Sequence, residues 1–273
     1  MFYLDRLDFN IAYACNLSCK GCISLSDFDR KGVEPLDSLL SQIDQWKRVI
    51  TPKVLTLFGG EPLLHPKLHN LIDAIRDAWP TTRIRLITNG YLLKKHDPAK
   101  WFDYKPFEIQ VSIHRSDHAH IINKEIKRIL DYKTDWQFKR VGDGKDHRDL
   151  IFYIDGFELW KSRFKDFVQP YQLEDGRLVP HNSNPADAHA SCGSPDTPVL
   201  YKNKLYKCPP VANILDVQED FVYNYEAVEN EIGLEKFVND IGKPESVCSM
   251  CPANADNPIN HFDKENVIVK HID

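Results

Sequence analysis

The first half of the chain alternates between short apolar segments and longer segments with helical periodicity. Apolar residues recur every three or four positions over 36–50, 66–79 and 117–132, and this spacing predicts helices with one buried face. The apolar segments between and after them predict strands, at 6–14, 53–58, 83–88, 107–114, 136–141 and 150–154. The segment 157–168 predicts one more helix.

Regular alternation of strand and helix is typical of a parallel sheet built from βαβ units. Five or six such units are expected along this part of the chain. That number fits a partial barrel of the (β/α)6 type better than a complete eightfold barrel. We therefore expect an α/β fold, with the partial barrel over residues 1–168.

The composition of the chain changes at about residue 169. Residues 169–190 are rich in Pro, Asn, Asp and Ser and predict a linker. Beyond it, 199–208 predicts a short hairpin that turns at Asn203 and Lys204, and 233–240 predicts a small helix. We expect residues 191–273 to form a small α+β domain. Because such a unit buries little apolar surface, a bound metal would help it to fold.

Charge and hydropathy narrow the class of protein. Hydrophobic residues make up 42% of the 273 residues, enough for a sizeable core. The net charge of −5 argues against broad adhesion to nucleic acid or to an anionic membrane. No apolar run approaches the roughly 20 residues of a membrane span, and the charged first ten residues do not resemble a signal peptide. These features predict a cytoplasmic protein that does not bind membranes.

The seven cysteines fall into two groups, which accounts for all of them. Cys15, Cys19 and Cys22 lie near the N-terminus. The second group lies near the C-terminus and comprises Cys192, Cys208, Cys248 and Cys251. Disulfides are rare in a reducing compartment, so this partition predicts two separate metal sites. A closed structural site takes four ligands, and the first group therefore leaves one position open.

The first cysteine group directly follows the first expected strand. Three further groups follow later strands: Gly59, Gly60, Glu61 and Pro62; Thr88 and Asn89; Ser112 and His114. Ligands gather at the carboxyl ends of parallel strands, so we expect all these residues to line one mouth. Simpler interpretations remain for each group. The thiols could be buried structural groups, or zinc ligands completed by a histidine, and the glycine segments could be tight turns.

Taken together, these motifs resemble those of the radical S-adenosylmethionine (radical SAM) enzymes. The resemblance covers roughly residues 5–155 and rests on the cysteine triplet and on the Gly-Gly-Glu-Pro segment at 59–62. It implies that the three cysteines, as catalytic ligands, bind three irons of a [4Fe-4S] cluster. The amino and carboxylate groups of S-adenosyl-L-methionine would chelate the fourth iron and so supply the ligand that the protein does not.

The resemblance also assigns cofactor-binding residues. Gly59 and Gly60 would let the backbone approach the methionine moiety, and the Glu61 region would accept from its ammonium group. The contacts implied for the ribose or methionine come from Thr88, Asn89 and Ser112. Two residues depart from the family's pattern: Gly21 stands where many relatives carry an aromatic residue, and His114 stands where a carboxylate is frequent.

The C-terminal cysteines resemble those of the twitch domain, a shortened relative of the SPASM domain of some radical SAM enzymes. This resemblance implies a second, auxiliary [4Fe-4S] cluster held by all four thiols. Such a cluster has no free iron and would accept or relay an electron. A structural zinc ion is the alternative for this site.

The resemblance implies hydrogen-atom abstraction from a small-molecule or nucleotide-type substrate, leading to oxidation or rearrangement. A one-electron donor such as flavodoxin or ferredoxin would be a partner. The expected barrel begins near residue 5, leaving no module for a leader peptide, which favours this hypothesis over a peptide- or protein-modifying maturase. Nucleic acid is a further, less favoured substrate. From another class, the chain could be a non-catalytic metal-binding protein on a degenerate radical SAM scaffold.

Overall fold

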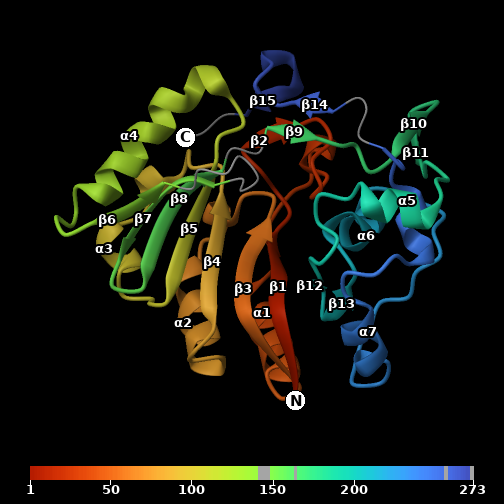
Figure 1. Ribbon diagram of the computed structural model, residues 1–273, viewed down its shortest axis with the longest axis horizontal. Helices are drawn as coiled ribbons and strands as arrows, with labels where there is room; N and C mark the ends of the chain where they lie inside the picture. The colour runs from red at the N-terminus through yellow and green to blue at the C-terminus, as the bar shows by residue number, and fades with distance from the viewer. Residues whose placement is uncertain (141–147, 163–164, 255–257, 271–273) are drawn as a thin grey trace.

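A sheet of nine strands organises the protein, as seen in a computed structural model that describes residues 1–140, 148–162, 165–254 and 258–270 (Figure 1). Six neighbouring strands of this sheet run parallel. In spatial order they are β12 (Val199–Tyr201), β1 (Phe2–Ala12), β3 (Ile50–Gly59), β4 (Arg83–Thr88), β5 (Phe107–Ser112) and β8 (Phe157–Ser162). Antiparallel strands border them: β13 (Lys204–Tyr206) on one side, and β7 (Arg148–Ile154) and β6 (Gln137–Arg140) on the other.

Helices connect the first parallel strands. The periodicity predicts α1 (Leu36–Trp46), α2 (Leu68–Ala78) and α4 (Ala119–Leu130), whereas it does not predict the short helix α3 (Pro98–Trp101). The apolar stripe of each long helix packs on the strand residues that face it, such as Leu55, Leu57 and Leu86, which are fully buried. The parallel α/β sheet that we predict over the first half of the chain is therefore confirmed through β5 and α4.

The prediction of a helix at 157–168 is wrong. This segment contains the parallel strand β8, followed by β9 (Asp166–Phe167). Phe157 and Leu159 are fully buried on the helix-covered side, and alternation of this kind is the period of a strand. A two-residue turn at Asp155 and Gly156, both with positive φ (43° and 81°), joins β7 to β8 as a hairpin. An Asp-Gly pair between apolar runs is a strong hairpin signal that could have identified this turn.

The C-terminal segments contribute strands to the main sheet. The hairpin of β12 and β13 turns at Lys202 and Asn203, one residue earlier than expected, and both have the left-handed φ of such turns (47° and 66°). Strand β12 pairs with β1 in parallel, so the last third of the chain joins the edge of the sheet. The division into domains at 1–168, 169–190 and 191–273 remains a proposal.

Shorter elements complete the fold. Residues expected as a linker contain β10 (Gln172–Glu174), β11 (Arg177–Val179) and α5 (Pro185–Ala190), and the helix expected at 233–240 is α7 (Leu234–Asp240). The remaining elements are α6 (Pro209–Asn213), β2 (Leu17–Cys19), β14 (Ile259–Asn260) and β15 (Val267–Val269). Single 3-10 turns lie at Ser26–Phe28, Pro62–Leu64, Leu93–Lys95, Ser116–His118, Ile214–Asp216, Ser246–Met250 and Lys264–Asn266.

The two larger apolar clusters among the described residues stabilise these layers. The larger lies between the sheet and helices α1, α2 and α4. The smaller lies in the C-terminal third, where Val211, Ile214, Val247 and Met250 pack with Leu25, three residues after Cys22. Within the described ranges, no helix is long and apolar enough to cross a membrane.

Candidate functional site

We call residues 13–25, which follow β1 and carry the first cysteine group, the cysteine loop. Cys19 is buried, and Cys15 and Cys22 are half-buried. The three thiols lie near enough that a charge on Cys22 or Cys15 would raise the pKa of Cys19. Burial raises the pKa of all three thiols, which keeps them protonated in the ligand-free chain. Three soft sulfur ligands from one loop suit a transition-metal centre with an open position.

The end of β3 stacks directly on this loop. Gly60 donates its N–H to the Ala12 carbonyl at 2.7 Å, and Glu61 donates to the Ala14 carbonyl at 2.9 Å. A Cβ atom on Gly60 would lie 2.2 Å from the Ala14 oxygen, so no larger residue fits there. On Gly59, whose φ is +143°, a Cβ would lie 2.3 Å from the Ala12 oxygen. The two glycines therefore admit the chain's own backbone next to Cys15.

The Glu61 carboxylate joins the ends of two strands. It is 1% exposed and accepts hydrogen bonds from the Thr88 hydroxyl at 2.8 Å, the Asn89 N–H at 2.9 Å and the Leu63 N–H at 3.0 Å. Burial raises its pKa to about 7, although these three donors oppose the shift. Pro62 is buried at the start of the following 3-10 turn. The carboxylate is thus engaged within the protein.

Asn89 extends this hydrogen-bonded group to the cysteine loop. Its side-chain amide donates to the Asn16 side chain at 2.8 Å and lies 3.7 Å from the Cys15 sulfur. Ser112, at the end of β5, lies on the same edge of the sheet and is half-buried. The expectation that the strand-end residues share one mouth agrees with these contacts, whereas their roles as ligands remain proposals.

His114, in the third strand-end group, contacts a histidine that sequence reasoning missed. His261, in the C-terminal segment, is 1% exposed, and its Nδ1 lies 2.8 Å from Nδ1 of His114. One ligand atom each from Cys19, His114 and His261 lie within 4.8 Å of one another. Burial lowers the pKa of His114 to about 3 and also lowers that of His261, so both imidazoles are neutral. No local motif marks His261, which lies 147 residues after His114.

Polar side chains occupy the sheet face that the helices leave uncovered. One row in register across the strands consists of Asp8, Thr56, Arg85, Glu108 and Glu158. Arg85 pairs with Glu108 at 2.9 Å, and the Trp160 indole donates to the same carboxylate at 2.6 Å. The Thr56 hydroxyl is buried without a partner among the described residues. The row gives this face of the sheet a polar character that the helix-covered face lacks.

The four C-terminal cysteines also converge. Cys192 follows α5, Cys208 precedes α6, and Cys248 and Cys251 flank the end of the 3-10 turn Ser246–Met250. Burial raises the pKa of the Cys251 thiol, and charges on Cys208, Cys192 and Cys248 would raise it further. Burial raises the pKa of Cys208 to about 12. The four thiols, all within the described residues, thus lie near one another, although no three of their sulfurs fall within 4.8 Å. As a set of four soft ligands they could hold zinc or a protein-bound cluster.

Comparison with protein families matches the part of the chain that contains the first of these two sites. Residues 9–137 match the family model described as the radical SAM superfamily. This part of the chain is a radical SAM superfamily domain. The domain contains the first cysteine group and the strand-end residues up to His114, whereas the four C-terminal cysteines lie outside it.

Curated relatives match half of the chain or less. The GTP 3',8-cyclase of Staphylococcus carnosus is 33% identical over 147 residues, covering 49% of this chain and 43% of the relative. The GTP 3',8-cyclase of Microcystis aeruginosa is 34% identical over 98 residues, covering 34% of this chain and 30% of the relative. The matches thus span less than half the length of these relatives.

Solved structures with similarity to this chain include BtrN in complex with AdoMet and 2-DOIA. It shares 16% identity with a TM-score of 0.49, over 90% of this chain and 85% of that chain. A second is anSMEcpe with bound AdoMet and Cp18Cys peptide, with 18% identity and a TM-score of 0.39, over 48% of this chain and 41% of that chain.

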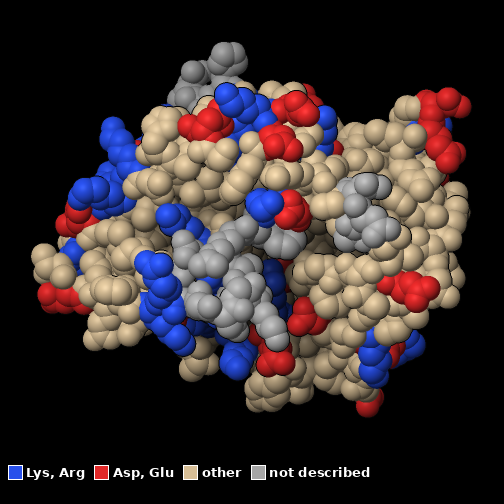
Figure 2. Space-filling model, turned by 45° about the horizontal axis from the view of Figure 1, so that its top comes forward, with Lys and Arg blue, Asp and Glu red and all other residues tan. Residues whose placement is uncertain are grey.

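The surface near the mouth of the radical SAM domain is unevenly charged. Figure 2, which is turned so that the carboxyl ends of the parallel strands come forward, shows Lys and Arg side chains concentrated on the side of β6–β8 and α4. The β6 residues Lys139 and Arg140 are among the exposed ones. The side of the C-terminal cysteines shows fewer. A chain of net charge −5 therefore presents a locally basic rim.

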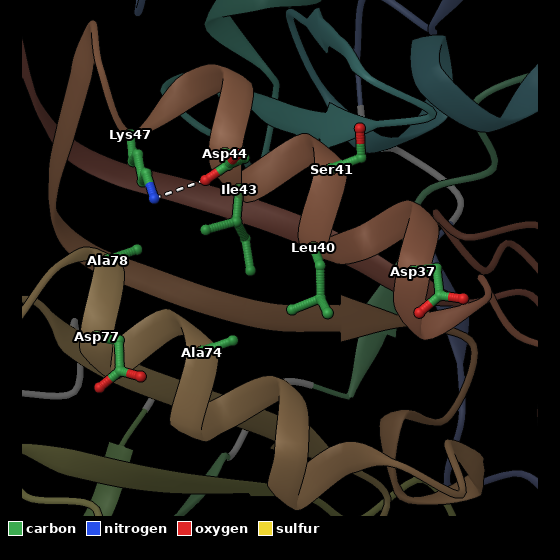
Figure 3. A pocket seen from close by; sticks show the side chains of 9 residues that line it. All are labelled: Asp37, Leu40, Ser41, Ile43, Asp44, Lys47, Ala74, Asp77 and Ala78. Atoms are coloured by element: carbon green, nitrogen blue, oxygen red, sulfur yellow. Dashed lines mark ion pairs between the residues drawn. The ribbon is translucent and has the colours of Figure 1, made fainter.

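A pocket on the opposite side of the sheet does not belong to this site. It lies between α1 and α2, where Asp37 and Asp77 line it and Asp44 pairs with Lys47 at 2.6 Å (Figure 3). None of the site residues expected from the sequence lines it. Its lining holds neither cysteine nor histidine, the residue types that gather at the carboxyl ends of the strands.

Proposed function

We propose that the chain is a radical SAM enzyme acting on a small-molecule or nucleotide-type substrate, with a second cluster at its C-terminal cysteines. The observation that carries this proposal is the match of residues 9–137 to the radical SAM superfamily, because the matched segment holds three converging thiols beside Gly60, Glu61 and Asn89. The same observation argues against a degenerate scaffold.

The first cysteine group fits a [4Fe-4S] cluster by its chemistry. Cys15, Cys19 and Cys22 would supply three thiolates, and Cys15 already accepts from the Leu17 N–H at 3.4 Å, a bond that favours its anionic form. S-adenosyl-L-methionine would occupy the open position, near Ser112 and His114. When bound, the cluster and this cofactor supply a 5'-deoxyadenosyl radical that abstracts a hydrogen atom from the substrate.

The chain's own residues would shape the site around that chemistry. Gly59 and Gly60 bring β3 against the cysteine loop, and Glu61 with Thr88 and Asn89 fixes the neighbouring strand ends. The polar row below would orient the substrate. A basic rim favours an anionic substrate, and the relatives named GTP 3',8-cyclase favour a nucleotide.

The second cysteine group would hold an auxiliary [4Fe-4S] cluster at Cys192, Cys208, Cys248 and Cys251. Because the protein supplies all four ligands, this cluster suits accepting or relaying an electron better than binding substrate. A flavodoxin- or ferredoxin-type protein would deliver the electron that begins the reaction.

Metal counts after anaerobic reconstitution test both sites. We expect about eight irons per chain, falling to about four in Cys248→Ala/Cys251→Ala. The parent should form 5'-deoxyadenosine from S-adenosyl-L-methionine, and Cys15→Ala/Cys19→Ala/Cys22→Ala should form none. Equal formation by parent and triple variant would refute the mechanism. About four irons with one zinc would make the C-terminal site structural.

A further inference from the structure

The C-terminal segment runs along the cysteine loop as a strand. Val267–Val269 pairs antiparallel with Leu17–Cys19, in the register Val267 to Cys19, Ile268 to Ser18 and Val269 to Leu17. Backbone bonds continue the pairing at both ends, since Lys20 donates to the Asn266 carbonyl at 3.0 Å and Lys270 donates to the Asn16 carbonyl at 2.8 Å. The segment thus follows the whole stretch between Cys15 and Gly21.

His261 adds a contact from the side. Its Nε2 lies 2.9 Å from the Lys20 carbonyl, which can only accept, so Nε2 donates. The ring stacks on Phe167 with centroids 3.7 Å apart, and its other nitrogen contacts His114. The backbone N–H of His261 also donates to the Lys165 carbonyl at 2.9 Å. Three contacts therefore hold the buried ring, and a fourth holds its backbone.

A third set of contacts joins the same segment to the residues that follow β5. The Arg115 guanidinium donates to the Val267 carbonyl at 3.1 Å, and Lys264 lies 3.7 Å from the Asp117 carboxylate. The segment is therefore held between the end of β5 and the cysteine loop. In Figure 1 it crosses above the carboxyl ends of the parallel strands, next to β2.

We propose that residues 259–270 form a clamp, which holds the cysteine loop in its ligand geometry and limits solvent access to Cys19. Loops are the least stable parts of most folds, whereas a paired strand opens less often. The clamp couples the retention of the first cluster to the C-terminal end of the chain. Its effect on the cluster rests on the proposed function, whereas its effect on the Cys19 thiol does not.

Ile268 offers a substitution that breaks the pairing with little loss of packing. Its side chain is 63% exposed. In an antiparallel ladder every second pair is hydrogen-bonded. Lys20 bonds Asn266 and Lys270 bonds Asn16, so the pair midway between them, Ile268 and Ser18, is also hydrogen-bonded. Ile268→Pro removes this N–H, and Val267 before it already has the extended backbone that proline requires (φ −138°, ψ 111°). Ile268→Thr keeps the N–H and is the matched control.

The first measurement is the rate at which a thiol reagent labels Cys19 in the metal-free full chain. Cys19 in Ile268→Pro should react about tenfold faster than in the parent, because the open loop becomes more populated. Ile268→Thr should react like the parent. Unchanged labelling in Ile268→Pro would overturn the clamp, whether or not the chain binds a cluster.

The second measurement is iron release to a chelator after anaerobic reconstitution. In Ile268→Pro about half of the iron should leave roughly tenfold faster than in the parent, while the half held by the C-terminal cysteines leaves at the parental rate. Equal acceleration of both halves would indicate general destabilisation and would overturn the clamp. A parent that holds no iron at Cys15, Cys19 and Cys22 would instead overturn the proposed function, and faster Cys19 labelling would still support the clamp.

Discussion

Glu61 shows how one buried carboxylate can organise a site. The sequence places it in a Gly-Gly-Glu-Pro segment, whose resemblance implies contact with the methionine ammonium. In the structure both carboxylate oxygens accept from Leu63, Thr88 and Asn89. Its first effect is therefore to join the ends of β3 and β4 beside Cys15. Any contact with the cofactor would add to this bracing.

The raised pKa of Glu61 predicts a pH-dependent stability. Its folded-state pKa is about 7, against an ordinary value of 4.5. The stabilisation is complete below pH 4.5 and is lost as the pH rises through 7, a change on the order of 3 kcal/mol. Glu61→Gln lacks this titration, so the variant should gain stability relative to the parent between pH 5 and pH 8. Urea unfolding at both pH values measures the gap, and a constant gap would contradict the prediction.

At the scale of elements, the site depends on close contact between two strand ends. The end of β3 lies against the loop after β1, and the backbone bonds from Gly60 and Glu61 fix their separation. The clamp segment contacts the same loop from its other side. The cysteine loop thus gains its shape from elements that are distant in sequence.

Gly60→Ala should disturb this contact. The new Cβ would clash with the Ala14 carbonyl and displace the backbone next to Cys15, so we expect loss of about half of the bound iron. Gly176→Ala is the control. It lies in the turn between β10 and β11 with φ +78° and open space around it, and should cost about 1 kcal/mol without loss of iron. Iron content and circular dichroism of both variants check this, and equal iron loss would contradict it.

At the scale of the molecule, Arg30 connects the two cysteine sites. Its guanidinium is 6% exposed and donates to the Ser24 carbonyl at 2.9 Å, two residues after Cys22. It also donates to the Asn213 side chain at 2.6 Å and pairs with Asp216 at 2.6 Å, both in the segment that follows Cys208. One side chain therefore holds the cysteine loop against the C-terminal third.

Arg30→Ala should destabilise the whole chain by about 2 kcal/mol, because Asn213 and the Ser24 carbonyl lose a buried donor. The loss is limited because Lys202 still pairs with Asp216 at 2.7 Å. Arg177→Ala removes an exposed ion pair with Asp220 and should cost less than about 1 kcal/mol. Chemical unfolding of the two variants compares them, and equal losses would show that Arg30 does not connect the halves.

Local patterns in the sequence determine much of this protein. The periods of two and 3.6 residues predict strands β1, β3, β4 and β5 and helices α1, α2 and α4, and the cysteine spacing separates the seven thiols into two groups. The same patterns miss β8, because Trp160 and Phe164 complete an apparent helical stripe in sequence, although Asp155 and Gly156 mark a hairpin turn. Periodicity, spacing and turn signals depend only on residues a few positions apart, and they can therefore be recognised in the sequence alone.

Tertiary structure decides what meets at the site. It brings His261 and the strand Val267–Val269 to the cysteine loop, more than 200 residues earlier in the chain. It also places β12 beside β1 and aligns Asp8, Thr56 and Arg85 in one row. These contacts depend on the register of strands and on the path of the chain between them. No local periodicity contains that information, because the pattern within each strand or helix is the same whichever distant segment packs against it.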